Sequence, residues 1–498
     1  MTEGGKLRPI MFVGTGSDVG KSIIATGFCR IFRQDGYHPA PFKAQNMALN
    51  SFVTPEGLEI GRAQAVQAEA AGIPCHTDMN PVLLKPSSDH TSQVVLNGRP
   101  IGNRDAYEYF RREGRDELRT EVYAAFDRLA SRFSPVVMEG AGSISELNLR
   151  DTDIVNMPMA MHAGACVILV ADIDRGGVFA SVYGSIMLLS AEERKYVRGI
   201  MINKFRGDLR LFDEGKKILE ELCGIPVVGV IPYYKDIHIE EEDSVALLVK
   251  QYAAGQGRVN VAVVLLRYLS NYTDFNVLER DPRVHLYYTN NTEELRKADI
   301  IILPGSKSTL ADLYELRRNG AAQAIVQAHR DGTTVLGICG GFQLMGMEVC
   351  DPDHIEGDIE RLPGLGLLPV TTVMTGEKVT RRTAFRFLDH TEECEGYEIH
   401  MGRTMPVEGA ASSPLNRLSD GTEDGYFVDA TCMGTYVHGI LDNPAVIDYL
   451  LSPYADKMEE RKSFDYVRYK DEQYDKLADH LRRYADVPLI YQLMKDDD

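Results

Sequence analysis

The sequence lacks the features by which membrane-spanning, secreted and disulfide-rich proteins are recognised. No apolar run in its 498 residues approaches the length that a membrane-spanning helix needs. The opening residues, MTEGGKLR, have no apolar core of the kind that a signal peptide contains. The eight cysteines form no CxxC pair, which argues against a zinc cluster or a disulfide framework. We therefore expect a globular, cytoplasmic protein with reduced thiols.

Clustered positive charge is also missing. The chain carries 73 Asp and Glu against 54 Lys and Arg, and its formal net charge is -19. Nucleic acids and anionic membranes require clustered basic residues, so we expect neither as the main partner. Small anions are compatible with this charge, because backbone N–H groups and a few basic side chains can bind phosphate inside an acidic protein.

The length of the chain predicts two domains, since one hydrophobic core rarely serves so many residues. We expect the first domain at residues 1–232, a linker region at 233–258 and the second domain at 259–498. The tail of the second domain, residues 445–498, has helical periodicity and carries no chemical motif. We expect it to pack against the second domain.

A glycine-rich loop, GTGSDVGKS at residues 14–22, lies between an apolar strand pattern and a helical pattern. In such loops backbone N–H groups surround the phosphates, the lysine reaches the terminal ones, and the hydroxyl binds Mg2+. The usual first glycine falls at Thr15 here, and glycine comes one residue early. A chance GKS tripeptide is the alternative. The residues predicted to bind ATP in this loop are Gly14, Thr15, Gly16, Gly20, Lys21 and Ser22.

Three further apolar segments, at residues 135–138, 166–170 and 199–202, each run into polar residues. Because strand patterns alternate with helical ones, we predict a doubly wound α/β sheet that binds ligands at its carboxyl edge. Glu139 follows the first segment and is expected to join Ser22 at Mg2+, with a solvated strand-end acid as the alternative. The amide of Asn203 is placed to bind a nucleotide base and completes the predicted ATP site.

Polar residues are unusually frequent in two segments between the first strands, FKAQNMALNSF at residues 42–52 and GRAQ at residues 61–64. We interpret them as a binding surface, with Lys43, Gln45 and Asn46 as candidate substrate-binding residues. Amide-rich loops that only cap helices are the alternative.

One cysteine lies at a sharp turn in TVLGICGGFQLMG, residues 334–346, between an apolar run and a helix start. Glycines on both sides permit the strained turn of a nucleophile elbow. There the helix N-terminus favours the thiolate, and backbone N–H groups can hold an oxyanion. Cys339 is therefore the candidate nucleophile, and Gly340 is a candidate oxyanion donor. A buried core cysteine is the alternative.

The oxyanion hole and a general base are expected elsewhere in the second domain. A strand pattern at residues 298–303 leads into PGSKST, where the N–H group of Gly305 is the second candidate donor. His438 ends a strand-like segment between Gly434 and Gly439 and is the candidate base. A structural histidine is the alternative reading.

The first half of the chain resembles the dethiobiotin synthetase-like P-loop ATPases, whose loop also begins with a glycine six residues before Gly-Lys-Ser/Thr. The segments FKAQNM, EIGRAQ, EGAGS, LRDTDIVNM, ADIDRGGVFAS and NKFRGD occur in this order. Together they make the chain resemble the cobyric acid synthase family. The resemblance implies that Asp153, in the DIVNM run, contacts substrate or metal.

The second half resembles the class I, or triad, glutamine amidotransferases, which release ammonia through a glutamyl thioester on the cysteine. We therefore expect a second doubly wound α/β domain of this kind. Most members have a Glu two residues after the histidine, where this chain has Ile440. The cobyric and cobyrinic acid amide synthases share this departure, and the group that orients His438 is left open. Glu398 and His400, in GYEIHMGR, are family residues whose role is also open, with a structural role as the alternative.

An ATP site and an ammonia source on one chain imply amide synthesis through an acyl phosphate. The resemblance implies amidation of the b, d, e and g carboxylates of adenosylcobyrinic acid a,c-diamide, which gives cobyric acid in cobalamin biosynthesis. The partners would be L-glutamine and this corrinoid, with ATP and Mg2+ and no tightly bound organic cofactor. The sequence indicates no oligomeric state. Two alternatives stay open: a cobyrinic acid a,c-diamide synthase, and a P-loop switch ATPase with a non-hydrolytic amidotransferase-like module.

Ammonia should pass internally from glutamine to the acyl phosphate, because at neutral pH free ammonia is mostly non-nucleophilic ammonium. During turnover with ATP and the corrinoid, we expect little of the released ammonia to appear in the medium. A coupled enzymatic assay of ammonia in the medium measures this. Complete loss of the ammonia to solution would contradict it.

Overall fold

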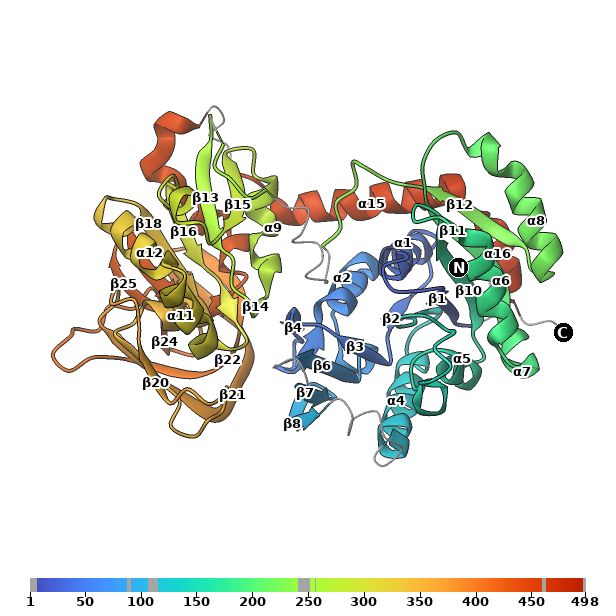
Figure 1. The fold of residues 1–498 in the computed structure, drawn as a ribbon, viewed down its shortest axis with the longest axis horizontal. Helices are drawn as coiled ribbons and strands as arrows, with labels where there is room; N and C mark the ends of the chain where they lie inside the picture. The colour runs from blue at the N-terminus through green and yellow to red at the C-terminus, as the bar shows by residue number, and fades with distance from the viewer. Residues whose placement is uncertain are drawn as a thin grey trace. The chain divides into compact units, whose positions relative to one another are not determined.

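The computed structural model describes residues 7–86, 91–105, 115–240, 251–255, 257–458 and 463–495 (Figure 1). The chain forms two compact units, unit 1 with residues 1–48, 59–240 and 468–498, and unit 2 with residues 49–58 and 241–467. The expected linker at 233–258 lies partly outside the described residues. No helix in the described part of the chain has the length and apolar character needed to cross a bilayer.

Unit 1 is built on a six-stranded parallel sheet with the order β12-β11-β10-β1-β9-β2. Its strands are β1 (Ile10–Gly14), β2 (Ala40–Phe42), β9 (Val136–Glu139), β10 (Cys166–Asp172), β11 (Val197–Phe205) and β12 (Val227–Pro232). Every residue of β1 and β9 is buried, as expected for strands with both faces covered. The predicted doubly wound sheet is confirmed.

Helices connect the strands of this sheet. They are α1 (Lys21–Gln34), α2 (Arg62–Ala71), α4 (Arg115–Ala130), α5 (Met157–Ala163), α6 (Val178–Leu188), α7 (Ala191–Arg194) and α8 (Asp213–Cys223). The register pairs Phe12 with Glu139 and Asp172 with Asn203. The polar strand ends therefore gather at the edge where the glycine-rich loop begins.

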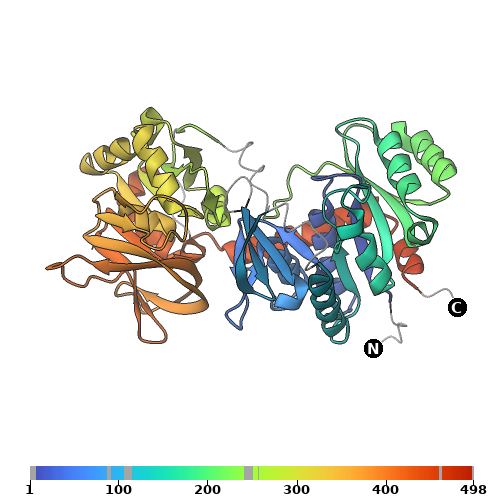
Figure 2. The same ribbon diagram turned by 60° about the horizontal axis from the view of Figure 1, so that its bottom comes forward.

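A smaller four-stranded sheet, drawn in blue in Figure 2, belongs to the same unit and has the order β3-β6-β7-β8. Its strands are β3 (Gln45–Met47), β6 (Val82–Pro86), β7 (Thr91–Leu96) and β8 (Arg99–Asp105). Asn97 and Gly98 join β7 to β8 with φ angles of 48° and 78°. Both residues tolerate this left-handed conformation, which suits a two-residue hairpin turn.

The C-terminal helices α15 (Tyr466–Tyr484) and α16 (Val487–Leu493) correct one expectation. The tail was expected to pack against the second domain, but residues 468–498 belong to unit 1. Leu477 and Leu481 lie in the same buried cluster as Phe28 of α1. The Arg30 guanidinium on α1 also binds Asp475, with 2.7 Å between Nε and Oδ1. The amphipathic pattern of α15 was recognised, but nothing in the pattern identified the surface that it covers.

Unit 2 contains a sheet with the order β15-β13-β16-β18-β26-β25, parallel except for β25. Its strands are β13 (Val259–Val264), β15 (Val284–Thr289), β16 (Ile300–Leu303), β18 (Thr334–Ile338), β25 (Tyr426–Asp429) and β26 (Cys432–Thr435). The helices of this unit include α9 (Asn276–Arg280), α10 (Thr292–Leu295), α11 (Thr309–Arg318), α12 (Ala321–Arg330), α13 (Gly340–Met345) and α14 (Pro444–Leu451).

A second sheet of unit 2 is dominated by two long antiparallel strands, β21 (Val370–Phe387) and β22 (Glu393–Pro406). The short strand β27 (Val437–His438) pairs with β22, and Tyr397 lies opposite His438. The chain therefore passes from the first sheet to the second between Thr435 and Val437. The remaining strands of this sheet are β19 (Glu348–Cys350), β20 (Arg361–Pro363), β23 (Asn416–Leu418) and β24 (Glu423–Asp424).

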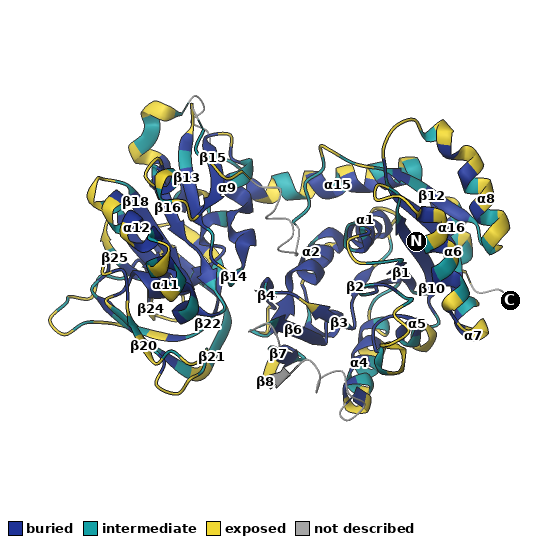
Figure 3. Ribbon diagram, viewed as in Figure 1, coloured by how far each residue is buried: buried dark blue, intermediate teal, exposed yellow. Residues whose placement is uncertain are grey.

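Burial follows the sheets in both units. Figure 3 shows the central strands β1, β10, β13 and β18 in dark blue, whereas α8 carries an exposed, yellow face. Each unit thus has its own buried sheet, which gives the strand-end residues a rigid support.

The packing of α15 on α1 predicts a stability effect. A Cβ at Gly27 would overlap the side chain of Leu481, which is 1% exposed. Leu481→Ala should lower the free energy of unfolding of unit 1 by about 2–5 kcal/mol, because it leaves a cavity. Urea unfolding of the full chain measures this. Leu211→Ala, at a side chain that is 83% exposed, is the matched control. Equal effects of the two substitutions would contradict the packing argument.

Candidate active sites

Cys339 lies at a strained turn between β18 and α13, as the elbow pattern predicts. Its φ and ψ angles are 53° and -110°, a region that residues other than glycine rarely adopt. Its N–H group donates to the Thr435 carbonyl of the neighbouring strand β26, at 2.8 Å. The pairing of Ile338 with Thr435 therefore places the end of β26 beside the cysteine.

The glycines around Cys339 are required by close backbone approaches. A Cβ at Gly341 would overlap the Leu303 carbonyl, and a Cβ at Gly340 would lie 2.7 Å from the backbone nitrogen of Ser306. A Cβ at Gly305 would lie 3.3 Å from Cε1 of His438. The structure thus brings the turns of both candidate oxyanion donors, Gly305 and Gly340, to the elbow. Their role as donors stays a prediction.

His438 has an orienting carboxylate that the sequence analysis missed. Its Nδ1 atom lies 2.7 Å from Oδ2 of Asp274, and the N–H group of Gly439 donates to Oδ1 of the same carboxylate at 3.1 Å. Both side chains are buried, at 1% and 4% exposure. Asp274 lies in a short 3-10 turn, Tyr272–Phe275. It therefore occupies the position of a third triad member.

The environment of His438 favours the imidazolium. Burial alone lowers its pKa, but the negative charges of Asp274 and Cys339 and the hydrogen bonds with both raise the pKa to about 10. A protonated His438 next to Cys339 can act as a general acid. The arrangement is therefore suited to nucleophilic attack by the sulfur with proton transfer through the imidazole.

Asp274 could not be found from local sequence, because it lies 164 positions before His438. A lone Asp in the segment YTDF resembles any turn residue. Only the adjacency of its turn to β27 identifies it. Position 440 holds Ile440, and Asp274 supplies the carboxylate to His438 from another part of the fold.

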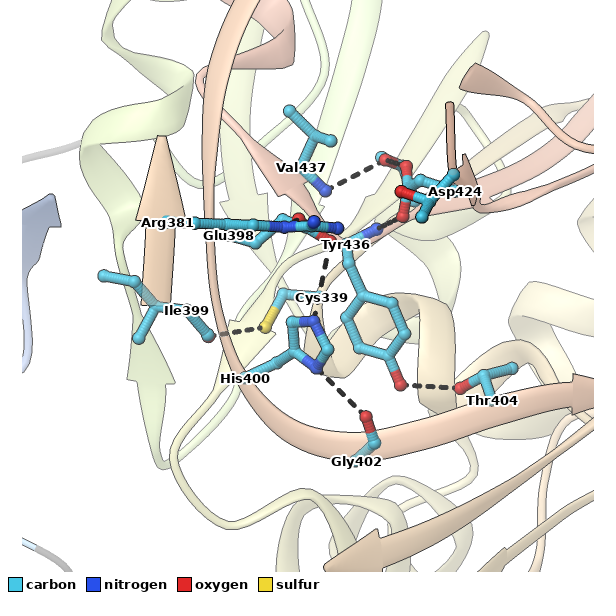
Figure 4. A network of polar contacts seen from close by, with 12 residues as sticks. Cys339, Arg381, Glu398, Ile399, His400, Gly402, Thr404, Asp424, Tyr436 and Val437 are labelled. Carbon is cyan, nitrogen blue, oxygen red and sulfur yellow. Dashed lines mark hydrogen bonds and ion pairs between the residues drawn. The ribbon is translucent and has the colours of Figure 1, made fainter. Parts of the chain in front are cut away.

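Glu398 and His400 do not contact His438 in the described contacts, but form a network of their own (Figure 4). Glu398 binds Arg381 and lies 3.6 Å from Nε2 of His400, while Nδ1 of His400 contacts the Gly402 carbonyl at 3.0 Å. Burial alone raises the pKa of Glu398, but His400 and Arg381 lower it below its ordinary value. Figure 4 also shows Sγ of Cys339 directed at the carbonyl of Ile399, 3.5 Å away. Ile399 lies between Glu398 and His400 on β22. Glu398 and His400 therefore order the strand that borders the cysteine.

In unit 1 the glycine-rich loop encloses Lys21. Its Nζ atom donates to the carbonyls of Gly16 and Gly142, at 2.9 and 3.0 Å. Burial lowers the pKa of Lys21 to about 8, with Lys43 lowering and Glu139 raising it. A Cβ at Gly14 would lie 2.7 Å from the Gly16 carbonyl, which explains glycine at this position. Lys21 is therefore held inside the loop, where a phosphate can replace the carbonyls.

Glu139 is the centre of a buried polar cluster. Its Oε1 atom accepts hydrogen bonds from Ser22 and Lys43, both at 2.8 Å, and its Oε2 atom accepts one from Gln67 at 2.7 Å. Burial alone raises the pKa of Glu139, but Lys43 and the hydrogen bonds lower it below its ordinary value. Ser22 and Glu139 are thus in contact, and their role at Mg2+ stays a prediction. Gln67 is a member of the cluster that the sequence analysis missed.

Asn203 and Asp153 both follow Glu139 in the sequence, and each contacts a loop. The Asn203 amide donates to the Val19 carbonyl at 2.8 Å, and among the described residues its buried Oδ1 atom has no partner. Asp153 accepts hydrogen bonds from the N–H groups of Val155 and Asn156, at 2.7 and 3.1 Å. Their roles in binding base, substrate or metal stay predictions.

The two polar segments contact each other. Nδ2 of Asn46 donates to Oε1 of Gln64 at 3.1 Å, and Oε1 of Gln45 accepts from Arg115 at 3.1 Å. Lys43 forms an ion pair with Glu139 and so joins the first segment to the Glu139 cluster. The role of these segments as a binding surface stays a prediction.

Comparison with family models defines the class of protein. Residues 10–246 match the CobQ/CobB/MinD/ParA nucleotide binding domain, and residues 260–446 match the CobB/CobQ-like glutamine amidotransferase domain. The chain is thus a P-loop nucleotide-binding domain joined to a class I-like glutamine amidotransferase domain.

Relatives that match over their full length identify the family to which the chain belongs. Proteins named cobyric acid synthase from Bacteroides fragilis and Phocaeicola vulgatus are 78% and 72% identical, over 99% of this chain and 99% of theirs. A protein of the same name from Parabacteroides distasonis is 60% identical over 98% of this chain and 99% of its own. The chain belongs to the cobyric acid synthase family.

The Asp274 carboxylate predicts the behaviour of a variant. Asp274→Asn should lower kcat for glutamine hydrolysis by about 10^2–10^4, because the imidazole loses its orientation and the charge that stabilises its protonated form. Asp389→Asn, at an exposed residue of the same unit, should leave kcat unchanged. Steady-state glutaminase assays measure both. A wild-type kcat in Asp274→Asn would contradict the triad.

A second expected result concerns pH. The pKa of His438 in the folded chain, about 10, lies above its ordinary value of 6.5. Its ion pair therefore stabilises the fold fully below pH 6.5, and this stabilisation is lost as pH rises through 10. Asp274→Asn removes the main raising charge, so its urea midpoint should fall less than that of the wild type between pH 7 and 10. An equal fall would contradict the assignment.

Proposed function

We propose that this chain catalyses the glutamine- and ATP-dependent amidation of the b, d, e and g carboxylates of adenosylcobyrinic acid a,c-diamide, which yields cobyric acid. The observation that carries the proposal is a Cys339–His438–Asp274 constellation on the same chain as a glycine-rich loop closed on Lys21 and Glu139. The name of the full-length relatives supports the corrinoid as acceptor.

In the glutaminase half-reaction, the Cys339 thiolate attacks the side-chain amide carbon of glutamine. The N–H groups of Gly305 and Gly340 stabilise the oxyanion, and His438 gives its proton to the departing ammonia. Water then attacks the glutamyl thioester while His438 takes a proton from the water, the bond between carbon and sulfur breaks, and glutamate and the Cys339 thiolate are released. Asp274 holds the imidazole in one orientation throughout.

In the synthetase half-reaction, a carboxylate of the corrinoid attacks the terminal phosphate of ATP to give an acyl phosphate and ADP. Ammonia attacks the acyl carbon, and phosphate leaves. Lys21 binds the terminal phosphates, Asn203 binds the base, and Lys43, Gln45, Asn46 and Asp153 form the acceptor side of the site.

Mg2+ fits the residues at the end of β9. Ser22 and Glu139 offer two hard oxygen donors, 2.8 Å apart, at the mouth of the loop. Substrate phosphates would supply further oxygen ligands to such an ion. Mg2+ would neutralise charge on the phosphates. The charge of Lys43 lowers the pKa of Glu139, which favours the ionised carboxylate that Mg2+ would bind.

Two alternatives make different predictions. A cobyrinic acid a,c-diamide synthase would act on the a and c carboxylates, and so would leave the a,c-diamide unchanged. A P-loop switch ATPase with a non-hydrolytic second module would hydrolyse no glutamine, and the buried Asp274–His438 pair beside Cys339 disfavours it.

Mass spectrometry tests the acceptor. After incubation of adenosylcobyrinic acid a,c-diamide with the protein, ATP, Mg2+ and glutamine, we expect products with up to four carboxylates converted to amides. No change in mass would overturn the proposed function, and a change only with cobyrinic acid itself would select the first alternative.

Two variants separate the half-reactions. Cys339→Ala should lose glutamine-dependent amidation by at least about 10^3-fold and keep amidation with ammonium salts, because only the thioester step is removed. Lys21→Ala should lose amidation with either nitrogen donor and keep basal glutamine hydrolysis. Unchanged glutamine hydrolysis by Cys339→Ala would refute the assignment of Cys339.

A further inference from the structure

Residues 49–58, here called the inserted segment, belong to unit 2 although the residues on both sides of them, Ala48 and Glu59, belong to unit 1. The segment includes β4 (Ser51–Val53). Asn50 and Ser51 are each 1% exposed, and Val53 is fully buried. A piece of chain that directly follows the Gln45–Asn46 surface is thus part of the amidotransferase core.

A pair of reciprocal hydrogen bonds joins the segment to the turn that carries Asp274. Oδ1 of Asn50 accepts from the N–H group of Tyr272 at 3.0 Å, and Oδ1 of Asn271 accepts from the N–H group of Ser51 at 3.2 Å. Asn271 has a left-handed φ of 52°, and its carbonyl accepts from the N–H group of Asp274 at 3.1 Å. The two amides therefore fix the backbone from which the Asp274 carboxylate projects.

A row of rings connects the same segment with the histidine. The ring of Phe52 packs edge-on against Tyr397, at 4.8 Å and 68°, and Tyr397 stacks on His438 at 5.4 Å and 20°. Arg382 also contacts the segment, since its Nε donates to the Val53 carbonyl at 2.8 Å and its guanidinium lies over the Phe52 ring. The imidazole of His438 is thus in contact with the Tyr397 ring on one face and with the Asp274 carboxylate at Nδ1.

A third set of contacts connects the inserted segment with Cys339 through Ile399. Val53 shares a buried apolar cluster with Tyr397 and Ile399 of β22. The Ile399 carbonyl is the group at which Sγ of Cys339 is directed. Each member of the Cys339–His438–Asp274 constellation therefore has a neighbour that the inserted segment contacts.

We propose that Asn50 and Phe52 are positioning residues of the glutaminase site, Asn50 acting through the Asp274 turn and Phe52 through Tyr397. This inference rests on the proposed glutaminase activity. The positioning requires hydrogen bonds of the right length and a ring of the right shape, so conservative variants separate it from mere packing. It also makes glutamine hydrolysis depend on a segment contiguous with the Gln45–Asn46 surface.

The test uses the full-length chain and compares four variants in glutaminase assays. Asn50→Ala removes the acceptor for the Tyr272 N–H group, and we expect kcat to fall roughly 10- to 100-fold with KM for glutamine changed less than about 3-fold. Asn50→Asp keeps an acceptor oxygen and should recover most of the loss. Glu56→Ala, at an exposed position of the same segment, is the matched control and should match the wild type.

Ammonium-dependent amidation, followed by mass spectrometry, is measured on the same preparations and should be unchanged in all four variants, including Phe52→Leu. Phe52→Leu keeps an apolar side chain but removes the ring, and should lower kcat with KM retained. A wild-type kcat in both Asn50→Ala and Phe52→Leu would overturn the proposal, as would a parallel loss of glutaminase and ammonium-dependent activities. Absence of glutaminase activity in the wild type itself would instead refute the proposed function.

Discussion

The hydrogen bond between Nδ1 of His438 and Asp274 is the interaction on which the arrangement of Cys339, His438 and Asp274 in unit 2 depends. Both groups are buried, and an imidazolium in that position without a carboxylate partner would be strongly destabilised. The first sheet supplies the cysteine, the second sheet supplies the histidine on β27, and a short turn supplies the acid. The paired charges hold these three elements in one geometry and keep His438 protonated beside the thiol.

In unit 1 a buried charge is also compensated by its neighbours, and here the charge is a carboxylate. Glu139 lies at the end of β9, and Ser22, Lys43 and Gln67 satisfy both of its oxygens. These donors come from the glycine-rich loop, from the segment after β2 and from α2. In unit 1 the end of a parallel strand positions the ionised group, whereas in unit 2 the strand β27, antiparallel to β22, carries His438. In both units neighbouring charges and hydrogen bonds shift the pKa of that group.

How much of the site could be predicted depended on how local its residues are. The glycine-rich loop and the elbow at Cys339 were recognised because a strand, a tight turn and a helix leave a pattern within about twenty residues. Asp274 left no such pattern, because its partner lies 164 positions away and the usual acid position holds Ile440. Gln67 was missed for the same reason, since its amide reaches Glu139 only across the folded sheet.

The sequence by itself determined the two α/β halves and the tight turns at the glycine-rich loop and at Cys339, since glycine spacing and apolar periodicity encode local backbone geometry. It predicted Cys339 as the nucleophile and His438 as the base. Tertiary structure alone decided the third triad member, the placement of α15 in the core of unit 1, and the inclusion of residues 49–58 in unit 2. An amphipathic helix or a buried amide is compatible with many surfaces, and only the assembled core selects the one that it contacts.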